Sequence, residues 1–218
     1  MSAAAPRWHA GPLTLASLLL ATELFADKPR KGSSTPYLSH LLAVSALVME
    51  HGGTEAQAAA GLLHDVLEDT GMDSHSLSTR LVAAGAGLDE TQLVVQIVEA
   101  STDGAHAEQR DGATWPTRKA VYLDALRSKA SSDPALLVSL ADKVHNIEAT
   151  LREVRKGTSA TSLYDAPWFN AKAPAQKWYY TSLAVVFREK LDTDREAVGL
   201  VQRLESAVGE IFSEVPLP

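Results

Sequence analysis

The stretch GLLHDVLEDT, residues 61–70, places four polar side chains in an otherwise apolar run. One imidazole and three carboxylates fall at positions i, i+1, i+4 and i+5, and they belong to His64, Asp65, Glu68 and Asp69. On a continuous helix this spacing puts all four on one narrow stripe, where carboxylates one turn apart repel each other. The stripe therefore predicts either the solvated face of an amphipathic helix or a site for a cation or proton.

Two further polar side chains interrupt apolar helices elsewhere in the chain. His40 stands within LSHLLAV, and Asp142 stands within VSLADKV. Taken alone, such a histidine is more often a hydrogen-bonded core residue, and such an aspartate usually has a partner such as Lys143. Taken together with His64 and Asp65, they form a mixed nitrogen and oxygen donor set that suits a divalent metal ion. A set of this kind leaves coordination positions for water and substrate.

Helices must position these side chains, because helical periodicity dominates the chain and no run of alternating β-branched residues appears. Three starts carry local signals: Thr35 before Pro36, a capping box in TEAQ, and Asp133 before a proline. We expect one all-α domain, residues 1–218, of about eight helices. The helical segments are expected at 13–26, 36–52, 54–71, 74–84, 89–101, 117–130, 134–155, 174–191 and 193–212.

Composition narrows the class of protein. The 218 residues carry a formal net charge of -7, which disfavours a general nucleic-acid-binding role, since that role usually needs a basic face. No cysteine is present, which excludes disulfides, thiolate metal sites and cysteine nucleophiles. The apolar segment 13–26 is too short to span a bilayer, so no membrane partner is expected. It fits a first helix better than a signal peptide, so we expect a cytoplasmic protein.

Three segments carry a resemblance to a known family. RKGSSTPYLSHLLAV, LLHDVLEDT and LADKVHN resemble, in this order, consecutive motifs of the hydrolase domain of RelA/SpoT-type proteins. The chain is most similar to a free-standing small alarmone hydrolase of the HD superfamily. The similarity covers roughly residues 13–190, and a C-terminal helix at about 193–212 follows. The resemblance implies an all-helical HD fold and manganese-dependent removal of the 3′-pyrophosphate from alarmones such as ppGpp or ppApp.

The same resemblance implies roles for individual residues. It makes metal ligands of His40, His64, Asp65 and Asp142. It makes Glu68 and Asp69 the acidic pair that acts on the attacking water, and Asn146 a polar residue near the nucleotide. Less securely, Asp103 matches a Thr-Asp element between the second and third motifs.

Cationic side chains are needed to receive the phosphates of such a substrate. The resemblance offers Arg30 and Lys31, although Ser33 and its neighbours shift the register of this pair against some relatives. Arg118 and Lys119 are further candidates, and a solvated helix start is the alternative for both. Lys143 is a candidate as well, with pairing to a neighbouring acid as its alternative.

Other readings stay open at this point. A different HD phosphohydrolase, such as a nucleotidase or an NADPH phosphatase, and a non-catalytic nucleotide-binding protein share the generic signature. The aromatic run KWYY, which includes Trp178 and Tyr179, fits a helix core better than a purine platform. On a helical wheel His145 points away from Asp142, so we expect a structural role for it. The choice between guanine and adenine, the native metal and the oligomeric state are not predicted.

Overall fold

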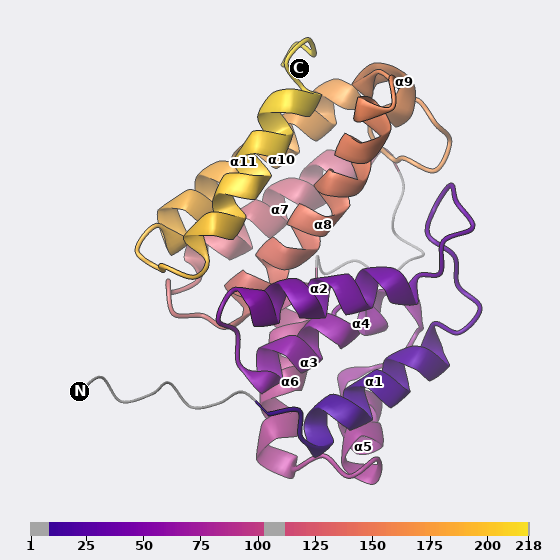
Figure 1. Cartoon of the computed structure of the whole chain (residues 1–218), viewed down its shortest axis with the longest axis vertical. Helices are drawn as coiled ribbons and strands as arrows, with labels where there is room; N and C mark the ends of the chain where they lie inside the picture. The colour runs from indigo at the N-terminus through magenta and orange to yellow at the C-terminus, as the bar shows by residue number, and fades with distance from the viewer. Residues whose placement is uncertain (1–8, 103–111, 218) are drawn as a thin grey trace.

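The computed structural model describes residues 9–102 and 112–217, and Figure 1 shows that this part of the chain consists of helices joined by loops. No strand occurs among these residues, which confirms the all-α prediction. Asp103 lies outside the described residues. The helices are α1 (Pro12–Leu24), α2 (Leu38–Glu50), α3 (Glu55–Leu63), α4 (Val66–Asp69), α5 (Ser74–Ala83), α6 (Leu88–Ser101), α7 (Trp115–Ser128), α8 (Ala135–Arg155), α9 (Ala160–Tyr164), α10 (Ala173–Leu191) and α11 (Val198–Ile211).

Helix α8 joins the two halves of the molecule. In Figure 1 helices α1 to α6 occupy the lower half and α7, α9, α10 and α11 the upper half. The 21 residues of α8 run from one half to the other, contacting α2, α3 and α6 on one side and α9, α10 and α11 on the other. Its buried side chains lie mostly in its first half, where Leu136, Val138 and Leu140 are fully enclosed. A polar side chain among them, such as Asp142, is therefore held in the interior.

The helix predicted over 54–71 is broken in the middle. Its capping box is present, with Thr54 and Gln57 each accepting from the other's backbone N–H. However, α3 ends at residue 63, and Asp65 adopts φ -94 and ψ 0 before α4 begins. The His64 imidazole explains the break, because its Nδ1 lies 2.8 Å from the Gly61 carbonyl oxygen that a continuous helix would offer to the backbone N–H of residue 65. The expected single stripe of four polar side chains is therefore wrong.

The start of α2 also differs from the prediction. The helix begins at residue 38 rather than at Pro36, which instead forms an isolated antiparallel bridge with Pro29. Segment 28–37 thus folds back on itself as a loop. Gly32 turns this loop with φ 72, and a Cβ there would lie 2.6 Å from the Trp168 ring, so the close approach requires glycine. The loop brings the predicted basic pair to the edge of α8.

Two smaller differences concern the second half of the chain. Helix α8 begins one residue after Pro134, and the Asp133 Oδ1 accepts a hydrogen bond from the Ala135 backbone N–H at 2.9 Å. Helix α9 was not predicted, because its five residues are too few to show a helical period. Its Tyr164 is nevertheless buried and packs against Phe212 just after α11. Helix α11 itself packs against α8 and α10.

Candidate metal centre

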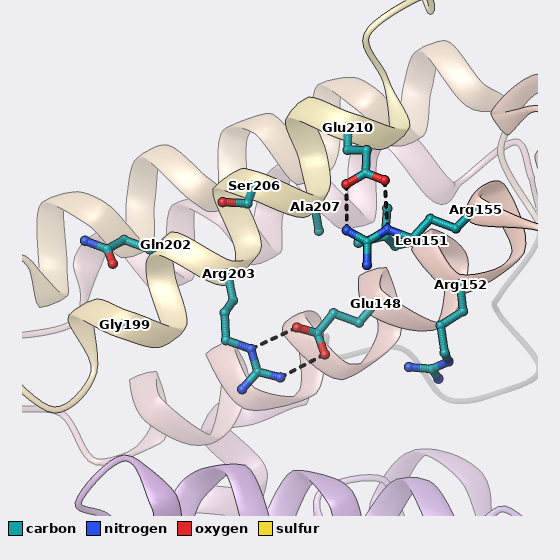
Figure 2. A pocket seen from close by; sticks show the side chains of 10 residues that line it. All are labelled: Glu148, Leu151, Arg152, Arg155, Gly199, Gln202, Arg203, Ser206, Ala207 and Glu210. Carbon is teal, nitrogen blue, oxygen red and sulfur yellow. Dashed lines mark hydrogen bonds and ion pairs between the residues drawn. The ribbon is translucent and has the colours of Figure 1, made fainter.

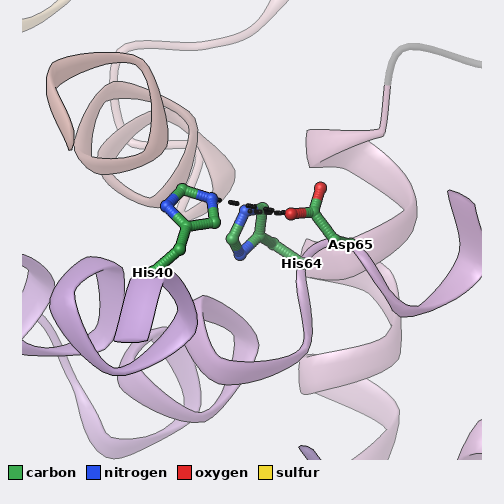
Figure 3. Close-up of side chains that lie close together, drawn as sticks. All are labelled: His40, His64 and Asp65. Atoms are coloured by element: carbon green, nitrogen blue, oxygen red, sulfur yellow. Dashed lines mark ion pairs between the residues drawn. The ribbon is translucent and has the colours of Figure 1, made fainter. Parts of the chain in front are cut away.

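Three of the predicted ligands meet where α2, the α3–α4 break and α8 come together. His40 comes from α2 and is 1% exposed. His64 is 5% exposed. The Asp65 Oδ2 lies 3.6 Å from His40 Nε2 and 3.0 Å from His64 Nε2. Figure 3 shows both imidazoles turned toward this carboxylate. One donor atom from each residue lies within 4.8 Å of the other two, a separation that suits a shared metal ion.

Asp142 supplies the fourth predicted ligand from α8. Its Oδ1 lies 3.2 Å from His40 Nε2 and 3.5 Å from His64 Nε2. Two imidazole nitrogens therefore face two carboxylates, of which Asp142 is buried and Asp65 partly exposed. The structure thus brings together all four residues that the sequence singled out.

The hydrogen bonding of His64 tests whether a metal ion fits here. Because its Nδ1 contacts the Gly61 carbonyl, Nδ1 carries the proton of the neutral ring and Nε2 carries a lone pair. This Nε2 is buried and has no hydrogen-bond partner among the residues that the structure describes. A lone pair aimed at carboxylate oxygens is unfavourable unless a cation lies between them. The donor set therefore fits a divalent metal ion.

Charge interactions favour the same conclusion. Burial lowers the pKa of the His64 imidazole, but the nearby Asp65 and Asp142 carboxylates outweigh burial and raise that pKa well above its usual value. The site thus attracts positive charge, whether as a proton or as a metal ion.

Three side chains hold the two carboxylates by donating hydrogen bonds to them. The Tyr37 hydroxyl donates to Asp65 Oδ2 at 2.6 Å. Lys143 Nζ donates to Asp142 Oδ2 and Asn146 Nδ2 donates to Asp142 Oδ1, both at 2.6 Å. Burial lowers the pKa of Lys143, but attraction to Asp142 outweighs it and raises that pKa above its usual value. Sequence reasoning missed Tyr37, although its position one turn before His40 was a usable signal.

His145, for which the sequence indicated a structural role, lies next to the ligand candidate His40. Its Nδ1 is 2.7 Å from the Nδ1 of His40, and the two ring centroids are 4.8 Å apart. The prediction considered only its relation to Asp142 on the same helix and overlooked the neighbouring α2. Burial, together with the charges of His40 and Arg30, lowers the pKa of His145 to about 3, so the ring is neutral at pH 7.

A pocket of about 220 Å³ opens above the two carboxylates and His64. Five of the predicted substrate-binding residues line it, namely Lys31, Arg118, Lys119, Lys143 and Asn146. Arg30 does not line it; its guanidinium donates to Asn146 Oδ1 at 2.8 Å and so supports the residue that holds Asp142. The pocket thus joins an anionic floor, formed by Asp65 and Asp142, to a cationic rim.

The predicted acidic pair is divided between two positions. Glu68 lines the pocket together with Asp65. Asp69 instead forms an ion pair with Lys28, whose Nζ lies 2.7 Å from Asp69 Oδ2. The Lys28 ammonium also lies over the Tyr37 ring, 4.7 Å from its centroid. The two neighbouring carboxylates therefore have different surroundings.

Aromatic side chains close one side of the pocket. Trp115 lines it, and the buried Tyr179 packs edge-on against Trp115 with centroids 5.6 Å apart. Trp178 also packs edge-on against Trp115, with ring centroids 6.5 Å apart. Lys119 Nζ lies 5.1 Å from the Tyr179 centroid, so the ring supports a cation of the pocket rim.

Comparison with known proteins places the chain in a family. A model described as an HD domain matches residues 17–164, a range that includes α2, α4 and all of α8. The chain belongs to the HD-domain family. The match contains all four predicted metal ligands. For an HD-domain protein with this His and Asp cluster, the bound cofactor is a divalent metal ion.

Curated HD-domain relatives carry related names. A guanosine-3′,5′-bis(diphosphate) 3′-pyrophosphohydrolase, MESH1, of Xenopus tropicalis is 30% identical over 152 residues, covering 66% of this chain and 75% of the relative. A probable enzyme of the same name from Synechocystis is 32% identical over 127 residues, covering 58% of this chain but 15% of the relative. A probable GTP diphosphokinase of Oryza sativa, RSH3, is 31% identical, with coverage of 60% and 18%. The chain therefore spans less than a fifth of the length of the latter two relatives.

Two solved structures share the fold of this chain. A metazoan orthologue of SpoT that hydrolyses ppGpp superposes with a TM-score of 0.64 at 20% identity, covering 97% of this chain and 99% of the other. The protein lmo0812 of Listeria monocytogenes superposes with a TM-score of 0.63 at 24% identity, covering 83% and 99%. Among the described helices of this chain, none has the length and apolar character needed to cross a membrane.

Proposed function

We propose that the chain hydrolyses the 3′-pyrophosphate ester of guanosine or adenosine alarmones such as ppGpp or ppApp, with Mn²⁺ as its metal ion. The observation that carries this proposal is the buried His64 Nε2, which has no hydrogen-bond partner among the described residues and lies under a pocket rimmed by cations. The names of the relatives supply the substrate class. The donor set also accepts iron, zinc or cobalt, so Mn²⁺ rests on the family resemblance.

The four ligands would be His40, His64, Asp65 and Asp142. A divalent ion held there supplies Lewis-acid activation of water and of a phosphoryl oxygen at neutral pH. The overall reaction breaks the bond between the 3′ oxygen and its phosphorus. Water adds its oxygen to that phosphorus, and the departing 3′ oxygen takes a proton.

Glu68 is the residue that we assign to proton transfer in this reaction. It lines the pocket one turn beyond Asp65, on the short helix α4. Asp69 is paired with Lys28 outside the lining, so we assign it to holding α4 in place. This division refines the expectation that both carboxylates act on water.

The cationic rim is assigned to the phosphates of the substrate. Lys31, Arg118 and Lys119 line the pocket from the 28–37 loop and from α7. Lys143 is drawn to Asp142, so its main effect is on that ligand rather than on a phosphate. Charge-assisted hydrogen bonds from the rim would place the 3′ end of the nucleotide over the metal ion.

We also propose that the chain is one domain. The support is the packing of α11 on α8 and α10, together with the position of α8 across both halves of the molecule.

Product analysis tests the proposed activity. The purified protein is incubated with Mn²⁺ and, in parallel, with ppGpp, ppApp, NADPH or a nucleoside monophosphate, and products are separated by ion-exchange chromatography. We expect pyrophosphate and a nucleoside diphosphate from ppGpp, and none after treatment with a chelator. Orthophosphate from NADPH or a monophosphate alone would identify a different phosphatase. Nucleotide binding without any turnover would identify a binding protein.

A further inference from the structure

The contact between His40 and His145 carries a chemical constraint. The two Nδ1 atoms are 2.7 Å apart, a distance at which one nitrogen must donate and the other accept. Two lone pairs or two N–H groups at this distance would repel. Among the described residues, His145 is the only hydrogen-bond partner of His40 Nδ1. The direction of this hydrogen bond therefore depends on whether the other nitrogen of His40, Nε2, carries a proton or a lone pair.

The other nitrogen of His40 faces the ligand cluster. Its Nε2 lies 3.2 Å from Asp142 Oδ1 and 3.6 Å from Asp65 Oδ2. To bind a metal ion there, Nε2 must present a lone pair, so the ring proton must reside on Nδ1. We propose that His145 is a positioning residue that accepts this proton's hydrogen bond and thereby fixes the tautomer and orientation of His40. The inference rests on the metal centre proposed above.

The two ligand imidazoles are thus held in different ways. His64 donates from its Nδ1 to a backbone carbonyl, that of Gly61. His40 has a side chain as its acceptor, so its support can be removed by substitution without altering the backbone. The acceptor belongs to α8, and the next residue, Asn146, holds Asp142 by donating a hydrogen bond from its Nδ2 to Asp142 Oδ1. Two adjacent side chains of α8 therefore each orient one ligand.

Two substitutions separate hydrogen bonding from packing. Asparagine places its Oδ1 near the position of a histidine Nδ1, so His145→Asn retains an acceptor, whereas His145→Leu fills the space without one. Isothermal titration of the metal-free protein with Mn²⁺ gives the affinity of each variant. We expect His145→Leu to weaken Mn²⁺ binding about 10- to 100-fold, the usual effect of removing a partner of a ligand histidine. His145→Asn should stay within about 3-fold of the unsubstituted protein, since the acceptor is kept.

His51→Leu is the matched control. His51 is a half-buried histidine at the end of α2, and its Nδ1 contacts the Leu47 carbonyl oxygen at 2.8 Å, away from the ligands. Its substitution should leave Mn²⁺ affinity unchanged. Equal weakening in His145→Leu and His145→Asn would assign the effect to packing and overturn the inference. Unchanged affinity in His145→Leu would overturn it as well, while failure of the unsubstituted protein to bind Mn²⁺ would instead refute the metal centre.

A measurement on the unsubstituted protein does not depend on whether these variants fold. Long-range ¹H–¹⁵N NMR spectra of histidine-labelled protein loaded with diamagnetic Zn²⁺ identify which ring nitrogen of each histidine carries the proton. We expect a proton on Nδ1 of His40 and on Nε2 of His145. A proton on Nδ1 of His145 would make it the donor and would overturn the inference.

Discussion

Two charged hollows share helix α8, and their differences show what marks a functional site. The larger, about 510 Å³, lies between the second half of α8 and α11. There Arg203 donates to both Glu148 oxygens at 2.9 Å, and Arg155 donates to both Glu210 oxygens at 2.8 and 2.7 Å (Figure 2). The hydrogen-bonding needs of these carboxylates are met within the protein itself.

The smaller pocket, about 220 Å³, has the opposite character. Its floor contains the buried His64 Nε2 without a hydrogen-bond partner among the described residues, next to the buried Asp142 carboxylate and the partly exposed Asp65 carboxylate. Buried polar atoms without partners are costly, so they persist where a ligand satisfies them or where function requires them. An unmet need for a cation, rather than the size of the hollow, therefore identifies the site.

The largest effect is expected from removing one ligand of the smaller pocket. Asp65→Ala deletes the carboxylate that both imidazoles face, so Mn²⁺ should no longer bind with measurable affinity. Turnover of ppGpp should fall to the level seen with chelator. Titration calorimetry and pyrophosphate release check both results, and thermal unfolding of the metal-free variant confirms that it is folded. Turnover at the unsubstituted rate would show that the metal centre lies elsewhere.

The next largest effect is expected from substituting Glu68, which lines the same pocket. Glu68→Gln keeps the size of the side chain but cannot accept a proton, so kcat should fall about 10²- to 10⁴-fold while Mn²⁺ affinity is retained. Steady-state kinetics together with titration calorimetry separate the two quantities. Asp69→Asn is the matched comparison, because Asp69 pairs with Lys28 and does not line the pocket. A larger loss of kcat in Asp69→Asn than in Glu68→Gln would reverse our assignment of the pair.

A smaller effect is expected from removing the hydroxyl that donates a hydrogen bond to Asp65. Tyr37→Phe removes the hydroxyl that donates to Asp65 Oδ2 at 2.6 Å but keeps the ring that stacks on Phe25. Mn²⁺ affinity should fall about 10-fold, the lower end for partners of metal ligands, because the ring still restricts the carboxylate. Calorimetric titration measures this. An affinity equal to that of the unsubstituted protein would show that the hydroxyl does not orient Asp65.

The smallest effect is expected from breaking an ion pair in the larger hollow, the groove between α8 and α11. Arg203→Met keeps most of the side chain's length and breaks the ion pair with Glu148, in which the arginine side chain is 41% exposed. An exposed pair contributes about 0–1 kcal/mol, so the free energy of unfolding should drop by that much at most. Mn²⁺ affinity and turnover should not change. A loss of turnover comparable to that of Glu68→Gln would mean that the groove between α8 and α11 takes part in the reaction.

Residue types and helical period were enough to predict the fold class and to single out the four proposed ligands, which the structure brings together. His40 and Asp142 could be found because each is a polar residue in an apolar helix, which is a one-dimensional signal. The break after residue 63 could not be found this way, since it depends on the His64 side chain taking the Gly61 carbonyl. Helical period alone treats residues 54–71 as one continuous helix.

Contacts between segments that are far apart in the sequence were the main feature that could not be predicted. Tyr37, Lys28 and His145 reach the site through packing of the 28–37 loop and α2 against α4 and α8, and such contacts between separate segments leave no periodic pattern in the sequence. Arg30 was expected to bind phosphate, but it lies against Asn146, a residue 116 positions away. Only the three-dimensional arrangement distinguishes a residue that meets the substrate from one that holds a ligand in place.

Locating the metal ion tests the central claim most directly. Crystals of the protein soaked in Mn²⁺ and measured near the manganese absorption edge would show each bound ion as a peak of anomalous scattering. We predict one strong peak, enclosed by His40, His64, Asp65 and Asp142. A map with no peak among these four residues, or with its strongest peak in the groove between α8 and α11, would contradict the account.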